Sequence, residues 1–169
     1  MPIQLCRPVF EQSIGKSVRF RQNEHSEIRS VVTEVRDPAD PITRFLASPA
    51  FGVVGASPRR HKYGNKVLRC YQQAGRRAIP VNPREAEIEG AACVASVLDL
   101  PDDVKSLSVI TPPAVTERVV EEAIRKGIEH VWMQPGAESD RAVAACEAAG
   151  INVIADGSCV LVVLGYRER

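Results

Sequence analysis

The side chains that could bind a charged ligand gather in one basic segment of the sequence. Between Pro41 and Arg84 there are nine basic residues and no acidic residue. The nine are Arg44, Arg59, Arg60, Lys62, Lys66, Arg69, Arg76, Arg77 and Arg84. Guanidinium and ammonium groups bind phosphate through charge-assisted hydrogen bonds, so this segment favours an anionic ligand. A solvated basic surface is the alternative interpretation as long as no motif is attached to the charges.

The rest of the chain balances this charge. Residues 85–169 hold fifteen acidic and seven basic side chains, residues 1–40 hold six of each, and the formal net charge is +1. Domains dedicated to nucleic acids are usually strongly basic as a whole, so we expect no nucleic-acid partner. One small ligand with several phosphate groups suits this distribution better.

The sequence contains no recognisable pattern for catalysis or metal binding. Its five cysteines show no Cys-x-x-Cys spacing and no cluster with histidine, so neither a zinc site nor a disulfide framework is predicted. The histidines, His25, His61 and His130, are scattered. Ser57 stands in Gly-Ala-Ser-Pro rather than in the Gly-x-Ser-x-Gly of a nucleophile elbow. Cys159 follows the last expected strand, where we expect it to be buried or unreactive. We therefore predict no catalytic residue and no metal.

Strands alternate with helices from residue 41 onward. Short apolar runs predict strands at residues 51–55, 78–81, 107–110, 130–133 and 151–155. Helical spacing of apolar residues predicts helices at residues 42–47, 64–74, 114–126 and 138–149. This order gives parallel βαβ units. The predicted fold class is α/β: a Rossmann-like, doubly wound parallel sheet of about five strands, in three layers α/β/α, with an N-terminal arm.

The chain length of 169 residues fits one such domain and a short extension. A turn with two prolines at residues 37–41 separates an N-terminal arm, residues 1–40, from the Rossmann-like domain, residues 41–169. Within the arm, residues 17–21 alternate like a strand, and residues 28–35 fit either a strand or a helical turn. The longest apolar stretch, residues 160–164, is far shorter than the roughly 20 residues of a membrane span. We expect a cytoplasmic protein with reduced thiols and no membrane partner.

The loop after the first strand is the first candidate binding element. In doubly wound sheets, ligands bind beyond the carboxyl ends of the strands, where the strand order reverses. This loop runs from Gly55 to Gly64 and leads into a helix, whose free N–H groups form a seat for phosphate. Arg59, Arg60 and Lys62 add cations. Because the loop is not Gly-x-Gly-x-x-Gly, a purely structural strand-to-helix turn is the alternative.

The loop after the second strand helps to choose between nucleotides. It reads Asn82-Pro83-Arg84, and the first acidic residue, Glu85, comes only after Arg84. An NAD site uses an acidic side chain here to bind the ribose hydroxyls, whereas a ribose phosphate needs a cation. NADP and coenzyme A (CoA) both carry a ribose phosphate, so this loop does not separate them.

Two further loops lie at the same expected edge. Thr111, Pro112 and Pro113 form a rigid segment that either lines a ligand or only starts a helix. Gln134 and Gly136 precede the next helix.

Several short motifs of the chain occur in the order found in a known family. They are Val53-Val-Gly-Ala-Ser57, Lys62-Tyr-Gly64, Pro80-Val-Asn-Pro83, Ile88-Glu-Gly90, residues 96–101, Thr111-Pro-Pro113 and Val131-Trp-Met-Gln-Pro-Gly136. With them, about residues 40–160 closely resemble the small stand-alone CoA-binding proteins. Those proteins are similar to the N-terminal CoA-binding domain of the succinyl-CoA synthetase alpha subunit and of nucleoside-diphosphate-forming acyl-CoA synthetases.

The resemblance implies a Rossmann-like domain that holds the nucleotide of CoA, or of an acyl-CoA, across the strand ends. It implies that residues 54–57 form the first nucleotide-contacting loop, that Arg84 lies near the 3′-phosphate, and that Lys62 and Tyr63 add contacts. With the loop residues above, the expected contacts are Val54, Gly55, Ala56, Ser57, Arg59, Arg60, Lys62, Tyr63, Asn82, Pro83, Arg84, Thr111, Pro112, Pro113, Gln134 and Gly136.

The resemblance also bears on catalysis. The larger synthetases phosphorylate a histidine in a separate domain that follows, and they need an ATP-grasp partner. This chain ends at Arg169, before any such domain, so we expect it to bind CoA or acyl-CoA without catalysis. The alternatives are an NADP-dependent oxidoreductase and a regulatory or assembly module for a separate acyl-CoA synthetase subunit. We expect a synthetase partner subunit or a homo-oligomer as the protein partner.

Overall fold

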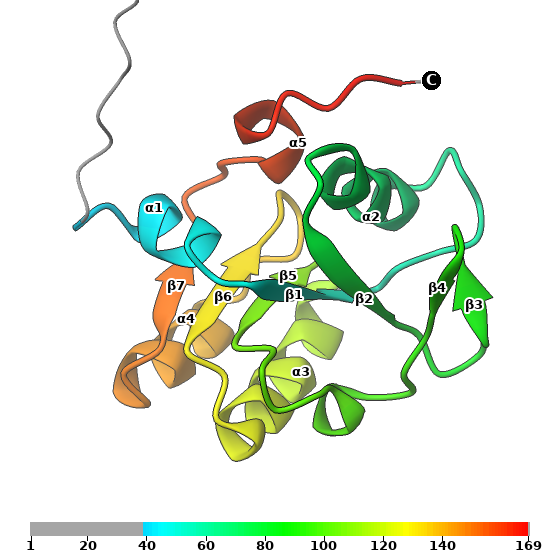
Figure 1. The fold of residues 1–169 in the computed structure, drawn as a ribbon. Coiled ribbons are helices and arrows are strands. Elements are labelled where there is room, and N and C mark those ends of the chain that lie inside the picture. Colours follow the sequence, from blue (N-terminus) through cyan, green and yellow to red (C-terminus); the bar gives the residue numbers. More distant parts are fainter. Residues whose placement is uncertain (1–38, 169) are drawn as a thin grey trace, which may run out of the picture. The chain divides into compact units, whose positions relative to one another are not determined.

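Five parallel strands form the central sheet in the computed structural model, which describes residues 39–168 (Figure 1). The strands lie in the order β2-β1-β5-β6-β7. Their bounds are β1 Ala50–Val54, β2 Arg77–Val81, β5 Ser106–Val109, β6 His130–Met133 and β7 Asn152–Ile154. Every neighbouring pair is parallel. The predicted α/β class and the five-stranded parallel sheet are confirmed.

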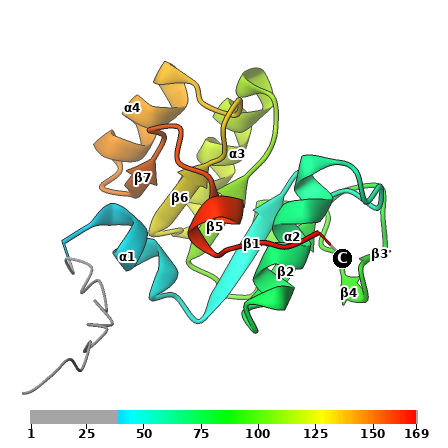
Figure 2. The same cartoon turned by 90° about the horizontal axis from the view of Figure 1, so that it is seen from above.

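Helices cover both faces of this sheet. They are α1 Pro41–Leu46, α2 Tyr63–Gln73, α3 Pro113–Lys126, α4 Asp140–Ala148 and α5 Val160–Val163. Figures 1 and 2 show α1, α2 and α5 on one face and α3 and α4 on the other. The three-layer arrangement follows from strands that are apolar on both sides, as β1 is along its whole length. Residues 1–38 of the expected N-terminal arm lie outside the described residues.

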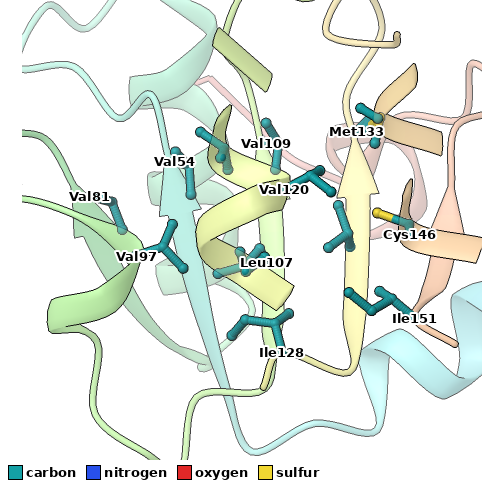
Figure 3. Packing of buried hydrophobic residues seen from close by; sticks show 14 of the residues in the cluster. Val54, Val81, Val97, Leu107, Val109, Val120, Ile128, Met133, Cys146 and Ile151 are labelled. Carbon is teal, nitrogen blue, oxygen red and sulfur yellow. The ribbon is translucent and has the colours of Figure 1, made fainter. Parts of the chain in front are cut away.

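Two apolar clusters fill the spaces between the layers. On the side of α2, Phe51, Tyr71 and Trp132 belong to one buried cluster. On the side of α3, Leu107 and Val120 belong to the other, together with Val97 from the long connection between β2 and β5 (Figure 3). The sheet is therefore buried on both faces, and its polar loops are confined to the strand ends.

Helix ends agree with the capping signals of the sequence. The side chain of Asp40 accepts a hydrogen bond from the Thr43 N–H at the start of α1. Helix α3 begins with Pro113 and ends before Gly127, whose φ of 72° lies in the left-handed region that favours glycine. These local signals explain why the predicted helix bounds agree with the structure to within about two residues.

The connection between β2 and β5 holds structure that the sequence did not predict. It contains the two-residue strands β3 Glu87–Ile88 and β4 Ala91–Ala92, which pair antiparallel, and the 3-10 helix η1 Val97–Asp99. Val94 donates its N–H to the carbonyl oxygen of Pro80. Pro80 itself has no N–H to donate, which is tolerated because β2 is an edge strand of the sheet. Elements this short carry no periodic pattern, and the same holds for the four-residue helix α5.

The strand order fixes where a ligand can enter. From β1 the chain moves outward to β2, and from β2 it returns to the other side of β1 to form β5. The order therefore reverses between β1 and β5. The loops beyond the carboxyl ends of these two strands diverge onto opposite faces of the sheet and leave a crevice there.

A buried polar pair in the core gives a first prediction. The hydroxyl groups of Tyr71 and Ser108 lie 2.7 Å apart between α2 and β5. Replacing Ser108 by Ala leaves the Tyr71 hydroxyl buried without this partner, so the free energy of unfolding should fall by about 1–3 kcal/mol. The double variant Tyr71→Phe/Ser108→Ala removes both groups and should recover most of this loss. Urea unfolding of Ser108→Ala, Tyr71→Phe and the double variant measures these free energies. If the double variant loses the sum of the two single losses, the pairing is contradicted.

Candidate functional site

Gly55 lies between the end of β5 and the first turn of α2. Its φ is +90°, and a Cβ atom placed on it would lie 3.1 Å from the carbonyl carbon and oxygen of Ile110. A Cβ on Gly64, in the first turn of α2, would lie only 2.1 Å from the carbonyl oxygen of Gly55. Only glycine allows backbone to approach backbone this closely. The end of β1 is thereby held between the end of β5 and the start of α2.

A groove opens beside this contact, at the carboxyl ends of β1, β2 and β5. Its volume is about 540 Å³. Its lining residues are Val54, Gly55, Val81, Asn82, Pro83, Arg84, Ala95, Ser96, Val97, Thr111, Pro112, Val115, Val119 and Glu122. We call it the β1–β5 groove. It contains seven of the residues expected from the sequence: Val54, Gly55, Asn82, Pro83, Arg84, Thr111 and Pro112.

One wall of the β1–β5 groove was not expected from the sequence. Val97 comes from η1, and Val115 and Val119 come from one face of α3, four residues apart. Ser96 and Glu122 add polar atoms at the same wall, and Glu122 Oε2 accepts a hydrogen bond from the Val97 N–H at 3.2 Å. An apolar wall with polar groups at its rim suits a flat aromatic ring such as a nucleotide base. The helical spacing of Val115 and Val119 was visible in the sequence, but it indicated only a core face.

Asn82 fixes the loops on both sides of the groove. Its Nδ2 donates to the carbonyl oxygen of Ala56, and its Oδ1 accepts from the Arg84 N–H, both at 2.8 Å. It therefore links the loop after β1 to the turn that carries Arg84. Arg84 itself is exposed at the groove, and none of the ion pairs between described residues involves it. Its guanidinium is available to an anion.

The loop between β1 and α2 holds the other expected cations outside the groove lining. Arg59, Arg60 and Lys62 are exposed, and Arg60 Nε lies 3.4 Å from Glu89 Oε1. The buried side chain of Asn65, which the sequence did not single out, donates through Nδ2 to the carbonyl oxygen of Ser57 at 2.8 Å. The loop position is therefore set from the helix, while its cations stay in solvent.

A smaller hollow lies next to the groove. Its volume is about 300 Å³, and it is lined by Tyr63, Ile110, Thr111, Pro112, Pro113, Pro135, Gly136 and Ala137. We call it the Tyr63 hollow. Thr111 and Pro112 line both spaces, so they form the ridge between them. Every lining residue of the hollow is uncharged, whereas Arg84 and Glu122 lie on the other side of the ridge.

The side chains of Tyr63, which lines the hollow, and of Gln134, which precedes the lining residue Pro135, are held by hydrogen bonds. The Tyr63 hydroxyl is hydrogen-bonded to Cys159 Sγ. Burial and the neighbouring Cys159 raise the pKa of Tyr63 above its ordinary range, so the phenol stays protonated. Gln134, an expected contact residue, is fully buried, and its Oε1 accepts from the Val160 N–H at 3.0 Å. Neither Gln134 nor Ala56 and Ser57 line the groove or the hollow.

A larger depression of about 700 Å³ lies at the end of the sheet opposite to the groove. Its lining includes Arg44, His130 and Asn152, and Arg44 Nη2 donates to Asn152 Oδ1 at 2.8 Å. His130 and Asn152 are the first residues of β6 and β7, so this depression lies at the amino ends of the strands. Doubly wound sheets bind ligands at the other edge, and we therefore take the β1–β5 groove as the candidate site.

No group of three or more His, Cys, Asp or Glu side chains within residues 39–168 is arranged to hold a metal ion. No helix in the same range combines the length and apolar character needed to cross a membrane.

Comparisons with known proteins agree with this geometry. Residues 50–164 match a protein family described as a CoA binding domain. An 86-residue stretch is 35% identical to acetate–CoA ligase (ADP-forming) I of Archaeoglobus fulgidus, covering 51% of this chain and 13% of that ligase. The solved structure of a conserved hypothetical protein from Pyrococcus furiosus has a TM-score of 0.65 and 39% identity, covering 68% of this chain and 97% of that one.

A large enzyme of known structure shares the same fold unit. It is the dinucleotide-forming acetyl-coenzyme A synthetase 1 of Ca. Korarchaeum cryptofilum, solved in complex with phosphate and ADP. The TM-score is 0.61 at 26% identity, and the match covers 70% of this chain but 27% of the synthetase. The chain thus spans only a small part of the ligases that it matches, and nearly the whole of the small archaeal protein.

The contact of Gly64 with Gly55 gives a second prediction. In an unobstructed helix, replacing Gly by Ala stabilises by about 1 kcal/mol. At Gly64 the new methyl group meets the Gly55 carbonyl, so Gly64→Ala should instead lower the free energy of unfolding, by about 1–3 kcal/mol. Urea unfolding decides the sign, and a stabilised variant would contradict the close contact.

Proposed function

The chain belongs to the CoA-binding domain family, and on this premise we propose that it binds coenzyme A or an acyl-CoA in the β1–β5 groove. The observation that carries the proposal is the division of the site by the Thr111–Pro112 ridge. On one side lie an apolar wall and a cation, and on the other lies a hollow lined by uncharged residues. CoA has the same division, with a phosphorylated nucleotide at one end and an uncharged pantetheine arm at the other.

The proposed contacts follow this division. The adenine ring lies against Val97, Val115 and Val119, and the ribose 3′-phosphate lies near Arg84. The diphosphate lies at residues 54–57 and the N-terminus of the eleven-residue helix α2, within reach of the cations Arg59, Arg60 and Lys62.

The pantetheine arm crosses Thr111, Pro112 and Pro113 into the Tyr63 hollow beside Gly136. Asn82 and Asn65 are proposed as positioning residues. Pro83 borders the nucleotide, and Gln134 positions the chain beside the hollow by accepting a hydrogen bond from the Val160 N–H.

We also propose that the chain binds CoA without turning it over. Supporting this, the matched stretch covers only 13% of the Archaeoglobus fulgidus ligase. A ligase needs further groups arranged around the transition state, and complementarity to a ground-state ligand alone gives no rate enhancement. A separate synthetase subunit as partner is part of this proposal, since another protein would then supply the remaining chemistry. NADP is the competing ligand, because it also carries a ribose phosphate.

Calorimetric titration of the full chain with CoA, acetyl-CoA, NADP and NAD tests the proposal. We expect saturable heat with CoA or acetyl-CoA and none with NAD. Absence of heat with both CoA species at millimolar ligand would exclude the proposed function. Saturation by NADP alone would replace it by an NADP-binding function.

The same titration tests the role of Arg84. Arg84→Glu should weaken CoA binding by about tenfold or more, because a charge-assisted hydrogen bond contributes about 1.5–3 kcal/mol. The same substitution should weaken the binding of dephospho-CoA, which lacks the 3′-phosphate, by a smaller factor. The matched control is Arg125→Glu, at an exposed α3 position outside the groove, which should leave CoA binding nearly unchanged. Equal losses of affinity for CoA and dephospho-CoA would show that Arg84 does not contact the 3′-phosphate.

A further inference from the structure

The lining that residues 39–168 give to the β1–β5 groove contains two charged side chains, Arg84 and Glu122. Arg84 lies in the loop after β2, and Glu122 lies in α3. None of the ion pairs between residues 39–168 involves either side chain. The proposed function gives Arg84 a phosphate as its partner, but it gives Glu122 none. Because a carboxylate repels an anionic ligand, its place in this groove needs an explanation.

Glu122 continues the apolar wall of the groove. It follows Val115 and Val119 at helical intervals of four and three residues, so the three side chains form one stripe along α3. The proposed function places the adenine ring against these two valines and Val97. Glu122 therefore extends the wall for the base by a carboxylate.

One oxygen of this carboxylate is already bound. Glu122 Oε2 accepts a hydrogen bond from the backbone N–H of Val97 at 3.2 Å, at the start of η1. This bond ties α3 to η1 and restricts the orientation of the Glu122 side chain. Oε1 makes no hydrogen bond or ion pair with any residue in the range 39–168. Glu122 thus brings to the groove one acceptor that these residues leave unpaired.

The neutral polar side chains of the same lining are already engaged with the protein. Both ends of the Asn82 amide are hydrogen-bonded to backbone. The Ser96 hydroxyl donates to Asp99 Oδ2 at 2.7 Å, and the Thr111 hydroxyl lies 2.9 Å from that of Thr116. Glu122 Oε1 is therefore the side-chain acceptor of the lining that is best placed to choose between bases.

We propose that Glu122 is the specificity-determining residue for the base, and that its Oε1 accepts a hydrogen bond from the exocyclic amino group of adenine. The inference rests on the proposed function, which puts the adenine ring on this wall. A carboxylate can only accept hydrogen bonds, and the unsubstituted ring nitrogens of adenine are acceptors as well. The amino group is thus the part of the base that Glu122 can bind, and the bond offsets the repulsion between Glu122 and the phosphates.

Calorimetric titration of the full chain with CoA and with etheno-CoA tests this role. In etheno-CoA a two-carbon bridge on the adenine ring removes both N–H groups of the amino nitrogen. We expect the wild type to bind CoA about tenfold or more tightly, because etheno-CoA leaves the carboxylate without this charge-assisted hydrogen bond. Equal affinities of the wild type for the two ligands would overturn the inference without any variant.

Glu122→Gln separates the hydrogen bond from the added bulk of the bridge. Its amide oxygen can still accept from the Val97 N–H, so its NH₂ group takes the place of Oε1 and meets the amino group of adenine as a second donor. Loss of the negative charge acts on both ligands alike, so the ratio of the two affinities is the readout. We expect this ratio to fall to about threefold or less. The matched control, Glu121→Gln, at an exposed position outside the groove, should keep the wild-type ratio.

The outcomes separate this inference from the proposed function. If Glu122→Gln keeps the wild-type ratio, etheno-CoA is rejected for its size alone and the role of Glu122 is overturned, while CoA binding stands. If the wild type binds neither ligand, the proposed function fails as well. If urea unfolding shows that Glu122→Gln does not fold, Glu122→Asp takes its place. Its side chain is shorter by one methylene group and should no longer reach the base, so the ratio should fall likewise.

Discussion

The close backbone contact at Gly55 is the constraint on which the rest of the site depends. One glycine carbonyl touches the first turn of α2, and the Cα of the same residue faces the end of β5. A side chain at Gly55 or Gly64 would separate these elements, and with them the loops that line the groove. The groove, the ridge and the Tyr63 hollow all begin within a few residues of this contact. This contact therefore fixes the relative positions of the loops that would hold the proposed ligand.

Folding sorts the nine cations of the basic segment into two roles. Several of them stabilise the fold: Lys66 and Arg69 pair with Glu168, and Arg77 pairs with Asp103. By contrast, within residues 39–168 the side chains of Arg59, Lys62 and Arg84 make no hydrogen bond or ion pair. These three belong to the loops after β1 and β2, at the carboxyl edge of the sheet. The sequence shows the excess of charge, but only the fold shows which charges are left for a ligand.

Most of the fold was predictable, and about half of the site. The apolar run that ends at Gly55 predicts β1 and the loop after it, because a buried parallel strand is apolar on both faces and ends where that run breaks. The wall made by Ser96, Val97 and Glu122 was not predictable, since it depends on how the long connection after β2 returns to α3. For Gln134 the sequence indicated a ligand contact, whereas its side chain is buried and lines neither the groove nor the hollow. Short elements without periodicity, such as η1 and α5, explain most of what the sequence missed.

The proposed function places CoA at the carboxyl edge of the sheet, across the Thr111–Pro112 ridge. An amide chemical-shift titration of the labelled chain with CoA tests it most directly. We expect the largest shifts at Gly55, Val97, Thr111 and Gly136, and little change at residues 129–130 and 149–152, which line the larger depression at the amino ends of the strands. Shifts confined to that depression, with the ridge unaffected, would contradict CoA binding at the carboxyl edge.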